Sequence, residues 1–192
     1  MGGGYLLNAV VFLVDLVFTL FMIAVLLRFL FQLFRADFFN PIAQALVKIT
    51  NPVLKPLHKV IPGLFGIDLS AIVLLVVIAI VKTFVVTLIS GITPKISGVL
   101  VLALAECIHL TLNVFIFAII IRAVVSWINP HAHHPGISLL NTITDPIIRP
   151  VRRFIPAMGS IDFSPFFVII ILILLSMLVY QPIHDIGRTL LR

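Results

Sequence analysis

The sequence predicts an all-α membrane protein in which four transmembrane helices form two parallel two-span repeats, each with an amphipathic interfacial helix in the connecting loop. One observation is composition. The 192-residue chain is 61% hydrophobic and 10% charged, with a mean hydropathy of +1.28, whereas a soluble domain carries about 25% charged residues. The other is repetition, because one residue pattern occurs twice at a constant offset.

The repeat is clearest in a proline-rich stretch. Residues 50–70 begin Thr-Asn-Pro-Val-Leu-Lys-Pro, and residues 144–164 begin Thr-Asp-Pro-Ile-Ile-Arg-Pro, an offset of 94 (144 − 50 = 94). The positions that keep their residue type here are Thr50/Thr144, Pro52/Pro146, Pro56/Pro150, Ile61/Ile155, Pro62/Pro156, Ile67/Ile161, Asp68/Asp162 and Ser70/Ser164. The same offset relates Arg28 to Arg122. We therefore assign residues 1–96 to the first repeat and 97–192 to the second.

Four apolar stretches are long enough to cross a bilayer core, which takes about 20 apolar residues. They are predicted at about residues 5–34, 67–92, 99–127 and 161–182. The fourth is expected to end at Gln181-Pro182, because proline has no N–H to continue a helix. Asp68 and Asp162 stand where the second and fourth spans begin, so we expect their carboxylates to cap those helices.

The loops at residues 35–66 and 128–160 carry a different pattern. Asn40-Pro41 is typical of a helix start, with asparagine as the cap and proline at the first helical position. The apolar residues after it fall at helical spacing: Ile42, Ala45, Leu46 and Ile49. This pattern indicates a short amphipathic helix in the plane of the membrane interface.

Three prolines then argue against one long helix in the first loop. Pro52, Pro56 and Pro62 each remove a backbone donor and obstruct the preceding turn. We therefore expect the interfacial helix to end near Asn51 and a separate turn to start at Pro56.

Two spans per repeat place both long loops on the same side of the membrane. The basic residues of these loops are Arg35, Lys48, Lys55, Lys59, Arg149, Arg152 and Arg153. Those of the opposite side are Lys95, Arg188 and Arg192. Basic residues concentrate on cytoplasmic loops, so the long loops are predicted to be cytoplasmic and both termini outside.

The stretch from Asp145 to Pro165 resembles the signature of the YggT family of small bacterial inner-membrane proteins, which also has chloroplast relatives. The likeness covers nearly the whole chain, including the duplication. The first copy departs from it where Gly63-Leu-Phe-Gly66 replaces Ala157-Met-Gly-Ser160 and where His58 replaces Arg152. The resemblance implies an inner-membrane location and a role in osmotic-stress tolerance, ion homeostasis or envelope organisation. It brings no catalytic residue.

An intramembrane polar cluster is predicted from depth. Asp15 and Lys82 each lie about ten residues, or about 15 Å, from the outer end of their spans. His109 occupies the position equivalent to Asp15 (15 + 94 = 109), and Glu106 lies one turn away on the same helix face. A charge at mid-membrane costs at least about 2.5–3.5 kcal/mol, so partners are expected. We predict that Lys82 pairs with Asp15, Glu106 or both.

Two interpretations of this cluster stay open. It can be a structural latch that fixes the register of the helices. Alternatively it can be a proton or cation relay in which Glu106 or Asp15 titrates beside His109.

The basic residues of the proline-rich segments also have two interpretations. Lys55, Lys59, Arg149, Arg152 and Arg153 can hold anionic lipid headgroups, each contributing about 1 kcal/mol near the surface. Alternatively they only mark topology. Arg28 and Arg122 are expected to extend to the interface.

Other site types find little support. His131, His133 and His134 suggest a metal, but no counterpart, carboxylate or cysteine nearby completes a site, so a solvated loop is expected and no metal or cofactor is predicted. No nucleophile with a paired base and no glycine-rich phosphate loop occurs, so we expect no enzyme. With so few charges in all, the net charge of +6 reflects topology rather than nucleic-acid binding.

The leading hypothesis is therefore a non-enzymatic membrane factor. It would bind anionic lipid or partner proteins, or form a homo-oligomer, through its cytoplasmic basic loops. The alternative is a small ion-conducting or ion-homeostasis protein that uses Asp15, Lys82, Glu106 and His109.

Overall fold

The computed structural model describes residues 3–63, 66–129, 134–154 and 162–191. Regular secondary structure in these ranges is helical. The first repeat contains α1 (Gly3–Leu33), α2 (Pro41–Val60) and α3 (Leu69–Ile89). The second contains α4 (Ile96–Ile128), α5 (Pro135–Phe154), α6 (Ser164–Leu175), the π-helical turn η1 (Ser176–Tyr180) and α7 (Gln181–Leu191).

Four helices in the described ranges are long and apolar enough to cross a membrane. They are Gly4–Leu33, Leu69–Ile89, Ile96–Ile128 and the continuous Ser164–Leu191. The chain is thus a multi-pass membrane protein, and the predicted all-α fold with four spans is confirmed.

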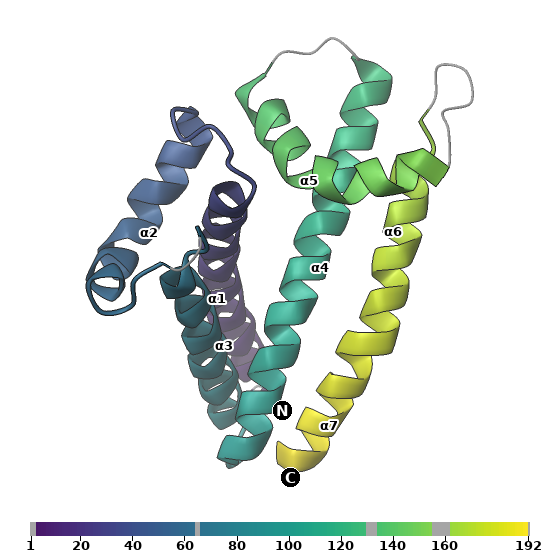
Figure 1. The fold of residues 1–192 in the computed structure, drawn as a ribbon. Helices are drawn as coiled ribbons and strands as arrows, with labels where there is room; N and C mark the ends of the chain where they lie inside the picture. The colour runs from purple at the N-terminus through teal and green to yellow at the C-terminus, as the bar shows by residue number, and fades with distance from the viewer. Residues whose placement is uncertain (1–2, 64–65, 130–133, 155–161, 192) are drawn as a thin grey trace.

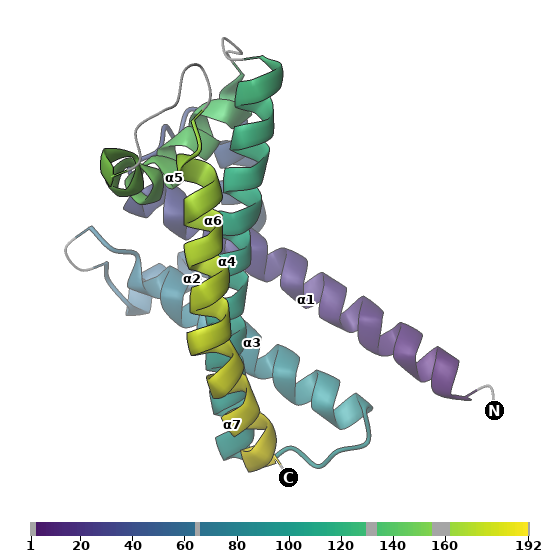
Figure 2. The same ribbon diagram turned by 90° about the vertical axis from the view of Figure 1, so that its right-hand side faces the viewer.

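The two repeats run in the same direction. Both termini lie at one end of the molecule, and α2 and α5 lie toward the other end (Figure 1). The hairpin of α1 and α3 is inclined to the hairpin of α4 and α6–α7, as the turned view shows (Figure 2). The two loop helices therefore share one side of the molecule, as an even number of spans per repeat requires.

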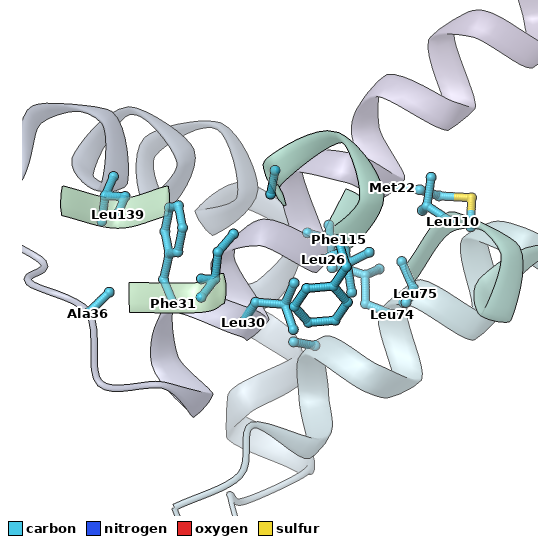
Figure 3. Close-up of a cluster of buried hydrophobic side chains, with 14 of the residues drawn as sticks. Met22, Leu26, Leu30, Phe31, Ala36, Leu74, Leu75, Leu110, Phe115 and Leu139 are labelled. Atoms are coloured by element: carbon cyan, nitrogen blue, oxygen red, sulfur yellow. The ribbon is translucent and has the colours of Figure 1, made fainter. Parts of the chain in front are cut away.

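The buried core lies where α1, α3, α4 and α5 meet. Met22, Leu26 and Leu30 of α1 pack toward side chains of α3 and α4 (Figure 3). Phe31 extends the cluster toward Leu139 of α5. Because this core crosses the repeat boundary, it holds the two hairpins together.

The expected break in the first loop helix is wrong. α2 continues through Pro52 and Pro56 to Val60, and α5 continues through Pro146 and Pro150. All four prolines are exposed, so the backbone carbonyls that lose a partner lie on the outward face, where other donors can reach them. Only Pro62, beyond the end of α2, limits this helix.

The face of α2 that packs on the protein also differs from the predicted stripe. Its buried residues are Ala43, Thr50 and Leu54. Ile42 and Ile49 of the predicted stripe stay 41% and 56% exposed. The stripe is therefore divided: Leu46 packs against the core and Ile42 borders a cavity between the spans, whereas Ile49 faces outward.

The fourth span continues beyond Gln181-Pro182, where an end was expected. The turn before Pro182 is π-helical, with the Gln181 N–H donating to the Ser176 carbonyl, and such a wide turn accommodates the missing proline donor. Close packing then holds α7 against α4. A Cβ atom on Gly98 would lie 2.6 Å from the Leu191 Cα, so only glycine permits this approach.

Candidate functional site: an intramembrane charge cluster and two anchored loop helices

Lys82 is the centre of the polar cluster inside the spans. Its Nζ lies 2.9 Å from Asp15 Oδ1 and 2.7 Å from Glu106 Oε1. It also donates to Thr19 Oγ1 at 2.7 Å. A lysine ammonium has three N–H donors and no acceptor, so these three oxygens use its full capacity. Lys82 is only 6% exposed, which explains why it needs all of them.

Three helices supply this cluster. Asp15 and Thr19 are one turn apart on α1, Lys82 is on α3, and Glu106 is on α4. The structure therefore brings Lys82 to both carboxylates that the sequence suggested as partners. The pair with Glu106 crosses from the first repeat to the second, so the cluster joins the two hairpins as well as the two spans of one hairpin.

The cluster is neither electrically neutral nor fully enclosed. Two carboxylates against one ammonium leave a formal charge of −1 (1 − 2 = −1). The side chain of Asp15 is 49% exposed, whereas that of Glu106 is 27% exposed. Asp15 is thus the member that faces the surroundings of the chain.

Among the contacts of the described residues, His109 has no hydrogen bond or ion pair with Lys82, and its ring has other neighbours. Its Nε2 lies 2.9 Å from Asn113 Nδ2. Because the amide nitrogen can only donate, Nε2 accepts and a neutral ring carries its proton on Nδ1. Nδ1 is buried and has no hydrogen-bond partner among the described residues. The ring stacks on Tyr180 of η1, with centroids 4.1 Å apart.

An arginine anchors each loop helix to the first span of its own repeat. Arg28 Nη1 donates to Thr50 Oγ1 at 2.7 Å and to Asn51 Oδ1 at 2.8 Å. In the second repeat, Arg122 Nη1 donates to Thr144 Oγ1 at 2.7 Å. The second acceptor there is the Asp145 carboxylate, also at 2.7 Å.

The two anchoring threonines are fully buried. Their hydroxyl protons go to the carbonyls four residues earlier, Leu46 and Leu140, which leaves their lone pairs free to accept from arginine. Arg28 and Arg122 thus extend to the loop helices that were expected at the interface, and their guanidinium groups bind acceptors there. The recurrence of threonine at positions 50 and 144 was the sequence signal from which these arginine contacts could have been predicted.

A second pair of contacts connects the end of each loop helix to the start of the next span. His58 Nε2 lies 2.9 Å from Asp68 Oδ2, and Arg152 donates to the Asp162 carboxylate in the second repeat. Asp68 is 2% exposed and caps α3 by accepting the Ala71 N–H at 3.1 Å. A histidine thus occupies the arginine position in the first copy, with an equivalent role.

Asp162 lies outside the membrane span and accepts the Ser164 N–H at 2.9 Å. Burial raises the pKa of this carboxyl, but hydrogen bonds from Ser164 and the hydrogen bond and charge of Arg152 outweigh it, so the pKa lies below its usual value. The carboxylate is therefore ionised at neutral pH, as its contact with Arg152 requires.

The remaining basic residues of the predicted binding set are exposed. Lys55, Lys59 and Arg153 are exposed on α2 and α5. Arg149 is 71% exposed and lies 2.8 Å from Asp145 Oδ2. Arg152 is 47% exposed while it contacts Asp162. All five cations therefore present charge on the outer surface of the two loop helices.

His131 and His133 of the histidine run lie outside the described residues. His134 is described, and its Nδ1 accepts the Gly136 N–H at 3.1 Å. Within the described ranges, no group of three or more His, Cys, Asp or Glu side chains is arranged to hold a metal ion.

Comparison with known proteins places the chain in a family. A sequence profile of the CCB3/YggT family matches residues 7–89 and again residues 101–183. The two matches are offset by 94 (101 − 7 = 94), which confirms the internal repeat. The chain belongs to the YggT family.

Relatives in this family cover nearly the whole chain. An uncharacterised protein of Pseudomonas aeruginosa is 38% identical over 174 residues, which is 90% of this chain and 88% of the relative. The uncharacterised protein YggT of Escherichia coli (strain K12) is 32% identical over 188 residues, 96% of each chain. An uncharacterised protein of Haemophilus influenzae is 35% identical over 155 residues, 80% of this chain and 82% of the relative. No solved structure matches the chain.

Proposed function

We propose that this YggT-family protein is a non-enzymatic factor of the bacterial inner membrane that binds anionic lipid headgroups or partner proteins through α2 and α5. In this proposal the loop helices are cytoplasmic and both termini are outside. The resemblance to the family connects such a role to osmotic-stress tolerance or envelope organisation.

The observation that carries the proposal is the combination of exposed cations with anchored helices. Lys55, Lys59, Arg149 and Arg153 are exposed, and the helices that carry them are held to α1 and α4 by Arg28 and Arg122. Because the helices are held, the backbone that carries these cations does not have to be ordered on binding. Each contributes about 1 kcal/mol at an anionic surface, so together they can select anionic lipid.

The intramembrane cluster supports this reading indirectly. Lys82 uses all three of its donors on Asp15, Thr19 and Glu106, which is what a latch between helices requires. No chemistry is needed to explain it.

The composition of the lipid that accompanies the protein tests the proposal. The protein is extracted from its native membrane with a belt of surrounding lipid, and the anionic fraction of that lipid is measured. We expect enrichment over the bulk membrane for the wild type. Substituting Lys55→Gln, Lys59→Gln, Arg149→Gln and Arg153→Gln should abolish the enrichment, whereas Lys95→Gln with Arg188→Gln at the other end should preserve it. Bulk composition around the wild type would refute lipid binding.

A second candidate function is ion or proton translocation through the cluster. Its formal charge of −1 and the 49% exposure of the Asp15 side chain favour it, because an unbalanced carboxylate can exchange a proton or cation. Flux into liposomes that contain the purified protein tests this function. It requires flux in the wild type that is lost in Asp15→Asn and kept in Lys95→Gln.

A further inference from the structure

Two adjoining cavities lie at the junction of the repeats. The larger, of about 700 Å³, borders the polar face of α5. Its polar lining residues are His134, Ser138, Asn141, Thr142, Asp145 and Arg149. Its volume falls in the range of sites that hold small molecules.

The smaller cavity is apolar, with a volume of about 350 Å³. It lies between α1, α4 and α5, and its lining includes Leu27, Phe31, Ile121, Val125, Leu140 and Ile143. His134 and Ile137 line both cavities. A polar chamber therefore opens beside an apolar cleft. A lipid has the same two parts, a polar headgroup and an apolar chain, so one lipid molecule could occupy both cavities.

A pair of linked ion pairs lies at the polar chamber. Asp145 has Arg122 on one carboxylate oxygen and Arg149 on the other, at 2.7 and 2.8 Å. Of these three groups, Asp145 and Arg149 line the chamber and Arg122 does not. The three linked groups sum to +1 (2 − 1 = 1), opposite in sign to the −1 of a phosphodiester. Arg149 is 71% exposed, so its remaining N–H groups can bind phosphate oxygens in pairs.

His134 adds a donor at the boundary between the two cavities. Its Nδ1 accepts the Gly136 N–H at 3.1 Å, so a neutral ring carries its proton on Nε2 and can donate it to an oxygen of a bound ligand, such as an acyl ester carbonyl.

The walls of this junction are held in place by contacts between the repeats. Asn40 Nδ2 donates to the Pro135 carbonyl at 2.8 Å, which connects the starts of α2 and α5. Ile42 and Gly136 are equivalent positions (42 + 94 = 136), and a Cβ atom on Gly136 would lie 3.3 Å from Ile42 Cδ1. Such a preformed site loses little free energy to ordering when it binds.

We propose that the junction of α1, α4 and α5 binds one phospholipid molecule. Its phosphodiester lies at Arg149, next to Asp145, and an acyl chain lies in the cleft between α1 and α4. This inference rests on the proposed function and narrows it to one site. Lys55 is the equivalent of Arg149 (55 + 94 = 149) but lines neither cavity.

Native mass spectrometry of the full-length protein tests the site. The protein is purified in detergent, supplied with phosphatidylglycerol, and stripped by further detergent. We expect one retained phospholipid per chain. Arg149→Gln should weaken retention about tenfold, since a hydrogen bond to a charged group is lost. Lys55→Gln, at the equivalent position of the first repeat, should weaken retention less than Arg149→Gln does. The control Lys95→Gln, which lines neither cavity, should retain lipid like the wild type.

A second pair of variants tests the apolar cleft. Val125→Phe narrows the cleft and should reduce retention about tenfold, whereas Val124→Phe, on the preceding residue of α4 and outside this cleft, should not. Thermal melting of both variants establishes that they fold.

The outcomes separate this inference from the proposed function. If Arg149→Gln and Lys55→Gln reduce retention equally, or if Val125→Phe has no effect, the single site is refuted while diffuse binding of anionic lipid stands. If glycerol phosphate or inorganic phosphate displaces the lipid at equal concentration, the chamber is a site for soluble phosphate and the lipid assignment fails. If lipid extracted with the wild-type protein has the bulk anionic content, the lipid binding in the proposed function is itself refuted.

Discussion

Lys82 of the first repeat donates a hydrogen bond of 2.7 Å to Glu106 of the second. Both side chains lie within predicted spans, so an ion pair connects the two hairpins where water is scarce. The pair is costly to break because each partner would remain as an unbalanced charge. The register of α3 against α4 is therefore set by a specific contact as well as by apolar packing.

Replacement of Lys82 should be strongly destabilising. Lys82→Leu leaves Asp15 and Glu106 without their shared cation, so we expect a loss of about 3 kcal/mol in unfolding free energy. Unfolding in mixed micelles measures it. The double variant Lys82→Leu with Glu106→Leu should recover part of the loss, because the uncompensated carboxylate is also removed. A single variant as stable as the wild type would contradict the latch.

The contacts of Arg28 should hold α2 to α1. Arg28→Met removes the donor to Thr50 and Asn51, and we expect a loss of about 1–3 kcal/mol. Hydrogen exchange of the α2 amides should increase with little change in α5. Thr50→Val removes the same contact, so the double variant should lose less than the sum of the single losses. Additive losses would show that the two residues act separately.

The Arg152–Asp162 contact should make stability depend on acid pH. The pKa of Asp162 is lowered on folding by Ser164 and Arg152, against the opposing effect of burial. A carboxyl with a lower pKa in the folded state stabilises fully above its unfolded pKa, and this contribution disappears as pH falls through the folded value. The melting temperature of Asp162→Asn should therefore lie below that of the wild type at pH 7, and the gap should close as the pH falls below the ordinary pKa of an aspartate and through the lowered pKa of Asp162. A gap that stays constant with pH would exclude this carboxylate as the cause.

The approach of α7 to α4 should tolerate no side chain at Gly98. A Cβ there would lie 2.6 Å from the Leu191 backbone, so Gly98→Ala must displace α7 and should cost about 1–3 kcal/mol. Gly4→Ala is the matched control, because nothing lies within 4 Å of its Cβ position. Equal melting temperatures for the two variants would mean that α7 does not pack as described.

The spans and the repeat could be predicted because their signals are contained in the sequence. Long apolar runs identify the spans, and the offset of 94 is visible in the proline-rich stretches. The partners of Lys82 could be predicted from depth in the span. Only a few charged side chains lie at mid-membrane, so they are expected to pair with one another.

Other features depend on tertiary contacts that no local pattern encodes. The acceptors of Arg28 become neighbours only once α2 folds back over α1. Pro52 and Pro56 break no helix because both face outward. Pro182 ends no span because a π-turn precedes it and α7 packs on α4. At these prolines, the tertiary surroundings override the tendency of proline to end a helix.

Trp127 offers the most direct test of lipid selection by the loop helices. It is the single tryptophan of the chain, it is 64% exposed, and it lies near the end of α4 beside a cleft that Asp162 also lines. Brominated lipids that contact it quench its fluorescence, so titration gives the relative binding constants of anionic and zwitterionic lipids. We predict a ratio of about fivefold or more in favour of brominated phosphatidylglycerol over brominated phosphatidylcholine. In Lys55→Gln with Lys59→Gln, Arg149→Gln and Arg153→Gln the ratio should fall to about one. A wild-type ratio of about one would contradict the account.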